Sequence, residues 1–295
     1  MAPKRQYVAF IGLGAMGFHM AGHLQEAGFM TRVYNRTTNK AEQWVARYGG
    51  SMAHTPREAA QNADIVCMCV GNDSDIRSVA YGDNGVLAGM APGSLLIDHT
   101  TASAELAREL ADRASRQAID FLDAPVSGGQ AGAVNGTLTV MAGGSQTAFD
   151  RAMAIFNSYA HNARRMGEVG AGQLTKMANQ ICIAGVVQGL AEALNFADKA
   201  GLDSRAVIAA ISKGAAQSWQ MDNRHATMID GEFDFGFAVD WMRKDLGIAL
   251  KTADDVGATL PLTALVDQFY ADVQNLGGGR WDTSSLIQRL RHLSN

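Results

Sequence analysis

Short, continuously apolar runs alternate along the first half of the chain with segments in which apolar side chains recur every three or four residues. The first run, YVAFI at residues 7–11, ends in glycine and is typical of a buried strand. The segment 16–27 has helical spacing, and Gly28 follows it in the position that a helix C-terminus favours. The same alternation continues, with strands expected at 31–34, 64–70, 94–98, 118–126 and 136–144, and helices at 38–47, 75–81 and 103–116.

Strands that alternate with helices at this spacing predict an α/β fold with a doubly wound parallel sheet. From about residue 171 the pattern changes, because the alternation typical of strands almost disappears. Residues 172–200 are expected to form one long helix, with further helices at 204–213, 238–256 and 262–276. The pattern therefore predicts an α/β domain over residues 1–163 and an all-helical domain over residues 164–295.

The composition fits a soluble globular enzyme, with 47% hydrophobic and 18% charged residues among 295. The net charge is −4 and no basic block stands out, so neither nucleic acid nor an anionic membrane is expected as a partner. The first residues resemble neither a signal peptide nor an anchor, and we find no uninterrupted apolar run of about 18 residues. We interpret Cys67, Cys69 and Cys182 as unpaired thiols and expect a cytoplasmic location and no metal site.

The segment GLGAMG matches the dinucleotide-binding pattern G-x-G-x-x-G, and it follows a predicted strand and opens a predicted helix. In this pattern Gly12 permits a tight turn, Gly14 lets the backbone approach a pyrophosphate, and Gly17 lets the helix pack on the strand. A purely structural turn is the alternative. The first domain is therefore expected to be a Rossmann-type, dinucleotide-binding domain. The cofactor contacts predicted in this segment are Gly12, Leu13, Gly14, Ala15, Met16 and Gly17.

The end of the second strand indicates which nicotinamide cofactor is preferred. An NAD site usually has a carboxylate there, bonded to the ribose 2′-hydroxyl, whereas this chain has Asn35 and Arg36. A guanidinium can hold a 2′-phosphate through two charge-assisted hydrogen bonds, and Thr37 adds a hydroxyl donor. The alternative is a solvated arginine beside a helix cap. We therefore expect NADP as the cofactor, with NADPH preferred over NADH.

In four separated blocks the chain resembles the β-hydroxyacid dehydrogenase family, which includes 3-hydroxyisobutyrate dehydrogenase and tartronate semialdehyde reductase. The blocks are FIGLGAMG (10–17), DAPVSGG (123–129), GAGQLTKMANQ (170–180) and FDFGFAVDWMRKDLGIAL (233–250). They occur in the family's order, and the resemblance covers about residues 7–290. It implies hydride transfer between a nicotinamide cofactor and a small hydroxyacid, in a homodimer or homotetramer.

The resemblance implies that Lys176 is the catalytic acid/base. This residue would protonate the carbonyl oxygen during reduction, or take the proton from the alcohol during oxidation. An ammonium is suited to this role because it neutralises the charge that develops on oxygen as the hydride arrives. To work as a base at neutral pH it needs a pKa below the value of about 10.4 for free lysine. The alternative is a solvated lysine near the start of an amphipathic helix.

Further positions of the family correspond to substrate and cofactor contacts. Those implied for the substrate are Ser127, Gly128, Gly129, Asn179 and Thr101, and those implied for the cofactor are Val70, Gly71, Asn72, Thr101 and Lys244. The alternatives are an ordinary turn for the SGG segment, and an ion pair with Asp240 for the second lysine. The family often has leucine, proline and asparagine at the positions of 70–72. Without the proline, we expect this loop to be less rigid.

Together these features predict an NADP(H)-preferring oxidoreductase that interconverts a small β-hydroxyacid and its semialdehyde or keto form. The partner molecule is then a small aldehyde or hydroxyacid that carries a carboxylate. Two alternatives remain. One is an NADPH-dependent imine reductase, although members of that group usually lack the lysine. The other is a non-catalytic scaffold that binds the cofactor.

Overall fold

The computed structural model describes residues 6–293, in which the chain folds into two compact units. The first unit ends at Lys176, inside the helix α9 (Ala171–Lys199). The boundary predicted at residue 163 falls instead within the strand β9 (Ala160–Gly167), which pairs with β8 (Leu138–Gly143) and so belongs to the first unit. The sequence AHNARRMG conceals this strand, because most of its side chains are polar and a search for apolar runs passes over them.

In the described residues, nine strands of the first unit form one sheet in the order β3-β2-β1-β4-β5-β6-β8-β7, with β9 paired to β8. The remaining strands are β1 (Tyr7–Ile11), β2 (Met30–Tyr34), β3 (Ser51–Met52), β4 (Ile65–Met68), β5 (Leu95–Asp98), β6 (Asp120–Asp123) and β7 (Val126–Ser127). Neighbours from β3 to β6 are all parallel, which confirms the predicted doubly wound parallel sheet. β8 instead runs antiparallel to β6 and β7, because only the short helix α7 (Gly129–Asn135) separates it from β7 and a parallel partner needs a longer crossover.

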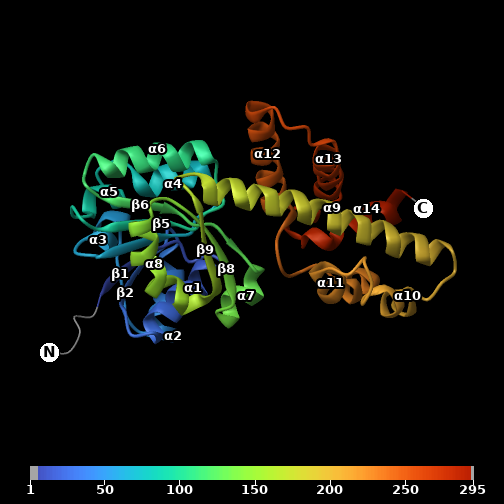
Figure 1. Cartoon of the computed structure of the whole chain (residues 1–295). Coiled ribbons are helices and arrows are strands. Elements are labelled where there is room, and N and C mark those ends of the chain that lie inside the picture. The colour runs from blue at the N-terminus through green and yellow to red at the C-terminus, as the bar shows by residue number, and fades with distance from the viewer. Residues whose placement is uncertain (1–5, 294–295) are drawn as a thin grey trace. The chain divides into compact units, whose positions relative to one another are not determined.

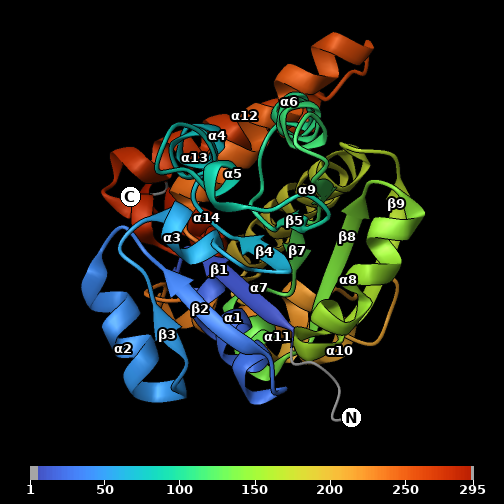
Figure 2. The same cartoon turned by 90° about the vertical axis from the view of Figure 1, so that its left-hand side faces the viewer.

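Helices cover both faces of this sheet (Figure 2). Successive strand side chains point to opposite faces, so Val8 and Phe10 join one apolar core whereas Ala9 and Ile11 join the other. The first core includes side chains of α1, α2, α7 and α8, and the second includes side chains of α3, α4, α5 and α6. These helices are α1 (Gly17–Glu26), α2 (Thr38–Tyr48), α3 (Pro56–Ala60), α4 (Asp73–Ala80), α5 (Val86–Gly89), α6 (Ala104–Ser115) and α8 (Gln146–Tyr159).

The second unit contains helices and no strand among its described residues. After α9 they are α10 (Ser204–Ile211), α11 (Trp219–Asp230), α12 (Val239–Val256), α13 (Pro261–Asn275) and α14 (Leu286–Leu293), with 3₁₀ turns η1 (Gly278–Arg280) and η2 (Thr283–Ser285). Figure 1 shows α12 beside α13 and α10 beside α11. Leu190, Met242 and Tyr270 lie in the shared apolar core of these helices.

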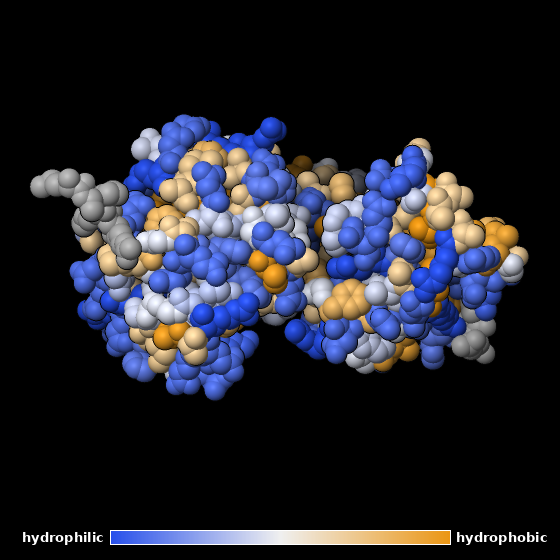
Figure 3. All heavy atoms as spheres, turned by 90° about the horizontal axis from the view of Figure 1, so that it is seen from below, coloured by the Kyte–Doolittle hydropathy of each residue, from blue (hydrophilic) through white to orange (hydrophobic). Residues whose placement is uncertain are grey.

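Within the described residues, α9 has the length and apolar composition that a membrane span requires. Its buried residues Ala184, Val187 and Leu190 belong to the core of the second unit, so packing inside the protein accounts for the apolar composition of this helix. On the face visible in Figure 3, polar side chains cover most of the first unit and the apolar patches are separate from one another.

Candidate active site

The parallel strands from β2 to β6 end along one edge of the sheet. The register partners along this edge are, in order, Tyr34, Ile11, Met68, Asp98 and Asp123. The predicted site segments of the first unit follow these strand ends: 12–17 after β1, 35–37 after β2, 70–72 after β4, 101 after β5 and 127–129 shortly after β6. In doubly wound sheets, ligands bind outside this edge where the strand order reverses, which here is between β1 and β4.

The glycine-rich turn after β1 has the geometry that a dinucleotide requires. Gly12 has a φ of +97°, and a Cβ there would overlap the Cys69 carbonyl oxygen. A Cβ at Gly17 would overlap the Gly12 oxygen, so α1 begins directly against the turn. A Cβ at Gly14 would meet nothing within 4 Å, so bare backbone faces open space there. Met16 caps α1 without a side-chain hydrogen bond, and these features together fit a pyrophosphate at the helix N-terminus.

At the end of β2, Asn35 holds the glycine-rich turn in place. Its Oδ1 accepts from the Leu13 amide at 2.9 Å, and its Nδ2 donates to the Thr37 carbonyl oxygen at 3.0 Å. The Arg36 side chain is 85% exposed, and its Nη1 lies 3.4 Å from Asp75 Oδ1. Thr37 caps α2 without a side-chain hydrogen bond. The Arg36 guanidinium is therefore exposed to solvent beside the Asp75 carboxylate, where a phosphate group can reach it.

The loop after β4 is tied to the loop after β5. The Val70 amide donates to Thr100 Oγ1 at 3.0 Å, and Asp73 accepts from both the amide and the hydroxyl of Ser103, at 3.0 and 2.6 Å. Asn72 Oδ1 accepts from the Asp75 amide at 2.9 Å and so caps α4. These hydrogen bonds restrain the loop in which the family often has a proline.

Lys176 lies in the second turn of α9 and is only 8% exposed, which argues against the alternative of a solvated lysine. The start of α9 is anchored to the sheet edge by Asp123 and Gln173. Asp123 accepts from the Gly170 and Gln173 amides, and the Gln173 side chain bonds the backbone of Thr100 and Ala102, on either side of Thr101. The fold thus links the helix that carries the lysine to the loop that carries Thr101.

The SGG segment leads directly into the short helix α7. Ser127 ends β7, whereas Gly128 and Gly129 have positive φ values of 126° and 62° and precede or open α7. Gly128 caps this helix without a side-chain hydrogen bond, so exposed backbone amides follow the Ser127 hydroxyl. Such an arrangement is suited to a small anion.

Two predicted site residues lie in the second unit. Asn179 Nδ2 donates to Gln180 Oε1 at 2.8 Å, and the buried Gln180 in turn donates to Asp245 Oδ2 at 2.7 Å. Lys244 Nζ lies 2.9 Å from Asp245 Oδ1. Asn179 and Lys244 are therefore joined within this unit through Gln180 and Asp245, two residues that the sequence analysis did not single out.

His99 is buried beside the site edge without the properties of a general acid. Its Nδ1 lies 2.7 Å from the Ala124 carbonyl oxygen, and its Nε2 lies 2.8 Å from the Tyr159 hydroxyl. Burial lowers the pKa of His99 to about 4, so the ring is neutral at physiological pH. We assign it a structural role between β5 and α8.

Burial also raises the pKa of two carboxyl groups at the sheet edge, that of Asp98 to about 7 and that of Asp123 to about 6. For Asp98 the folded protein binds the proton more tightly than the unfolded chain, whose pKa is about 3.9. Its contribution to stability is therefore fully present below about pH 4 and is lost as the pH rises to about 7.

We expect Asp98→Asn to remove this loss, because an amide does not ionise and its oxygen still accepts from the Thr100 amide. Relative to wild type, the variant should gain free energy of unfolding by up to roughly 1 kcal/mol per pH unit between pH 5 and 7. Urea denaturation at pH 5 and pH 8 measures this. If the difference in free energy of unfolding between the variant and wild type is the same at both pH values, the raised pKa of Asp98 is refuted.

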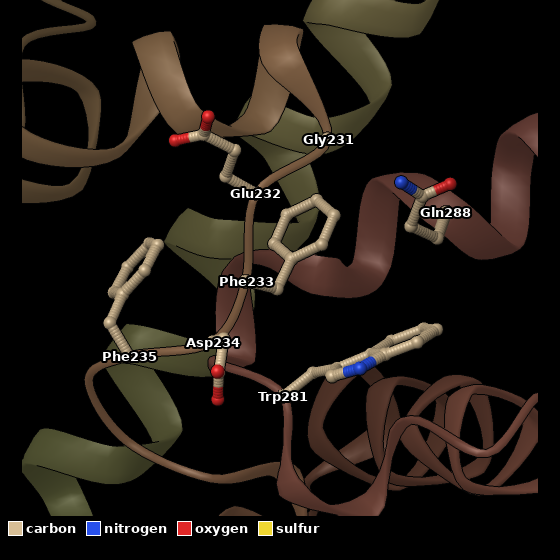
Figure 4. Close-up of a pocket in the computed structure, with 7 residues that line it drawn as sticks. All are labelled: Gly231, Glu232, Phe233, Asp234, Phe235, Trp281 and Gln288. Atoms are coloured by element: carbon tan, nitrogen blue, oxygen red, sulfur yellow. The ribbon is translucent and has the colours of Figure 1, made fainter.

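A pocket of about 510 Å³ lies within the second unit (Figure 4). The rings of Phe233 and Trp281 and the Gln288 amide border the same space. Its lining also includes the acidic Glu232 and Asp234, which repel a carboxylate, and none of the predicted site residues. The described residues contain no group of three His, Cys, Asp or Glu side chains that could hold a metal.

The residues that anchor the site were not predicted from the sequence. Asp123 and Gln173 lie inside two of the family-like blocks, DAPVSGG and GAGQLTKMANQ, but nothing local distinguishes them from solvated polar residues. The available signal was their position: Asp123 ends an apolar run, and Gln173 precedes Lys176 by three residues, on the same helix face.

The strand order and the glycine-rich turn define a dinucleotide-binding protein of the Rossmann class. Comparison with known proteins agrees. The model of the NAD binding domain of 6-phosphogluconate dehydrogenase matches residues 7–170, and the model described as NAD-binding of NADP-dependent 3-hydroxyisobutyrate dehydrogenase matches residues 170–290. The chain belongs to the β-hydroxyacid dehydrogenase family and is an NAD(P)-dependent oxidoreductase.

Similar proteins extend over nearly the whole chain. An uncharacterized oxidoreductase of Shewanella frigidimarina is 63% identical over 283 residues, or 96% of this chain and 97% of that protein. The 2-hydroxy-3-oxopropionate reductase of Escherichia coli is 33% identical, over 98% of each chain. A structure of Mycobacterium tuberculosis 3-hydroxyisobutyrate dehydrogenase with L-serine has a TM-score of 0.87 and 31% identity, and the match covers 97% of this chain and 99% of that one.

Proposed function

We propose that this protein is an NADPH-preferring enzyme that interconverts a small β-hydroxyacid and its semialdehyde or keto form, with Lys176 as the acid/base. The observation that carries the proposal is the placement of this lysine. It is buried near the start of a helix whose first turn is anchored to the same sheet edge as the glycine-rich turn. A dinucleotide that binds at that edge would lie along the same edge as the end of β6, to which the first turn of this helix is hydrogen-bonded.

The chemistry follows from the residues. Bound NADPH supplies the hydride that reduces the carbonyl carbon. Lys176 gives its ammonium proton to the carbonyl oxygen, so that the charge developing there is neutralised as the alcohol forms. In the direction of oxidation the neutral amine takes this proton back. Thr101 and Asn179 are proposed to orient the substrate, and Lys244 and residues 70–72 to contact the cofactor.

The substrate is proposed to be held by its carboxylate. Ser127 offers a hydroxyl, and Gly128 and Gly129 offer backbone amides at the N-terminus of α7, where the helix favours negative charge. The related structure from M. tuberculosis carries L-serine, a small molecule with a β-hydroxyl and a carboxylate. The E. coli relative is named for the reduction of 2-hydroxy-3-oxopropionate, which also carries a carboxylate. Both support a small acid as the substrate class.

NADPH is proposed as the preferred cofactor because Arg36 stands free of the sheet in solvent, where it can reach a 2′-phosphate. No carboxylate ends β2, since the position next to Tyr34 holds Asn35, whose amide is engaged by the Leu13 and Thr37 backbones. A ribose 2′-hydroxyl therefore lacks the acceptor that an NAD site provides.

Initial rates with NADPH and with NADH test the proposal against a panel of small aldehydes, keto acids and hydroxyacids, with a cyclic imine included. We expect turnover of carboxylate-bearing semialdehydes, and at least tenfold less for the same aldehydes without the carboxylate. Turnover of the imine alone would favour an imine reductase. Binding of NADPH without any turnover would favour the scaffold.

We further propose a cytoplasmic homodimer or homotetramer assembled through the second unit. Its exposed large apolar side chains include Val186 and Phe196 on α9 and Leu262 and Leu265 on α13, which would become buried against a second copy. Sedimentation at micromolar concentration should give a dimer or tetramer, and Phe196→Glu should shift it toward the monomer. A monomeric wild type would refute the proposal.

A further inference from the structure

The catalytic lysine of the proposed mechanism needs a fixed place, and two buried residues of the first unit supply it. We propose that Asp123 and Gln173 are positioning residues that lock the first turn of α9, and with it Lys176, against the loop that carries Thr101. This inference rests on the proposed function. Neither residue is assigned a contact with substrate or cofactor.

Asp123, the last residue of β6, caps the N-terminus of α9. Its side chain has no exposed surface, its Oδ1 accepts from the Gly170 amide at 2.7 Å, and its Oδ2 accepts from the Gln173 amide at 2.9 Å. A helix usually receives this help from the side chain of its own capping residue. Gly170, which precedes α9, has no side chain, so the carboxylate at the end of β6 takes that role.

The backbone leaves no room for this helix start to move toward the sheet. A Cβ at Gly172 would overlap the Met141 carbonyl oxygen and would lie 2.6 Å from the Asp123 carbonyl oxygen. A Cβ at Gly143, on β8, would lie 2.5 Å from Asp123 Oδ1. The first turn of α9 therefore sits directly on the ends of β6 and β8, with glycines at the points of closest approach.

Gln173 extends the lock to the loop after β5. This side chain is 1% exposed, its Oε1 accepts from the Ala102 amide at 3.0 Å, and its Nε2 donates to the Thr100 carbonyl oxygen at 2.7 Å. The oxygen and the nitrogen of one side-chain amide thus bind the backbone of the two residues that flank Thr101. Lys176 is three residues further along α9, on the same face of the helix. One side chain consequently fixes the distance between the loop and the face that carries the lysine.

The consequence for catalysis is geometric, and for Asp123 it is also electrostatic. Proton transfer requires donor and acceptor to be held within a fraction of an ångström, and a misplacement of about 1 Å costs roughly 100-fold in rate. An ionised Asp123 also places a negative charge at the positive end of α9. This charge favours the ammonium form of an amine in the second turn, so removing it should make the lysine release its proton at a lower pH.

The first test replaces Gln173 with leucine, which keeps the volume and removes both side-chain hydrogen bonds. We expect kcat to fall about 100-fold while the NADPH dissociation constant, measured by fluorescence titration, changes less than about twofold. Gln188→Leu is the matched control, because Gln188 is a buried glutamine of the same helix in the second unit, and it should keep wild-type kcat. A kcat for Gln173→Leu within threefold of wild type would overturn the inference.

A second variant keeps the test decisive if the leucine variant does not fold. Gln173→Glu can donate to the Thr100 oxygen only while its carboxyl is protonated. Its kcat relative to wild type should therefore fall as the pH rises from 5.5 to 8. A ratio that does not change with pH would contradict the positioning role.

Asp123→Asn provides a readout that needs no substrate. The titration of Lys176 can be followed by NMR on protein whose lysines carry ¹³C-methyl groups, with Lys176→Arg used for assignment. We expect the midpoint to move to lower pH in Asp123→Asn, and an unmoved midpoint would contradict the electrostatic part of the inference.

Lys176→Ala is measured alongside. If it retains turnover, the proposed function fails, whatever the other variants do. If it is inactive and Gln173→Leu is not, only the positioning inference fails.

Discussion

Lys176→Ala is expected to lower kcat by about 10²–10⁴-fold, the range that general acid–base catalysis contributes. The physical reason is that hydride arrival leaves an alkoxide with no nearby proton, because water must replace a buried ammonium. The NADPH dissociation constant should stay within about twofold, since the proposed phosphate contacts lie on the glycine-rich turn and at Arg36. Steady-state rates and fluorescence titration measure the two quantities separately.

Two further variants sharpen this result. Lys176→Arg keeps the positive charge but has a pKa above about 12, so it can stabilise the developing charge and cannot exchange the proton at neutral pH. It should therefore recover part of the kcat lost in Lys176→Ala and still remain far below wild type. Lys199→Ala, at the exposed C-terminal end of the same helix, should behave as wild type. A Lys176→Ala enzyme with most of its turnover would refute the acid/base role.

Arg36→Ala is expected to reduce the preference for NADPH over NADH, expressed as the ratio of kcat/KM values, by about 10- to 100-fold. This corresponds to about 1.4–2.7 kcal/mol, roughly the worth of one charge-assisted hydrogen bond to a 2′-phosphate. Most of the change should appear as a higher KM for NADPH, because the phosphate is remote from the reacting carbon and is bound equally in the ground and transition states.

Asp75 should act in the opposite direction. Its carboxylate lies 3.4 Å from the Arg36 guanidinium, so it competes with the phosphate for the same donor. We expect Asp75→Asn to raise the NADPH preference by up to about fivefold, in line with the 0–1 kcal/mol of an exposed ion pair. Arg116→Ala, which removes a similarly exposed arginine paired with Asp112, serves as the control. We expect the NADPH preference to fall in Arg36→Ala and to rise in Asp75→Asn. A change in the same direction in both variants would contradict the assignment of Arg36 to the 2′-phosphate.

Much of the fold could be predicted from the sequence because its signals are local. The glycine-rich turn, the alternation of β1, β2, β4, β5 and β6 with helices, and the long α9 each depend on residues within a few turns of one another. α3, α5 and α7 were missed, since segments this short are too brief to show a helical period. α8 was missed although Ala148, Ala152, Ile155 and Phe156 are buried at helical spacing.

The sequence by itself indicated most strands of this protein's sheet, though not β3 or β9, and it indicated where a dinucleotide is expected and which lysine is the candidate acid. Only the tertiary structure decided how these are held together. The amide of Gly170 binds a carboxylate 47 residues earlier, and Gln173 binds the backbone of Thr100, 73 residues earlier. Periodicity cannot register such contacts, because they depend on which strand ends share an edge. That edge is fixed by the strand order and register, and these are properties of the folded chain as a whole.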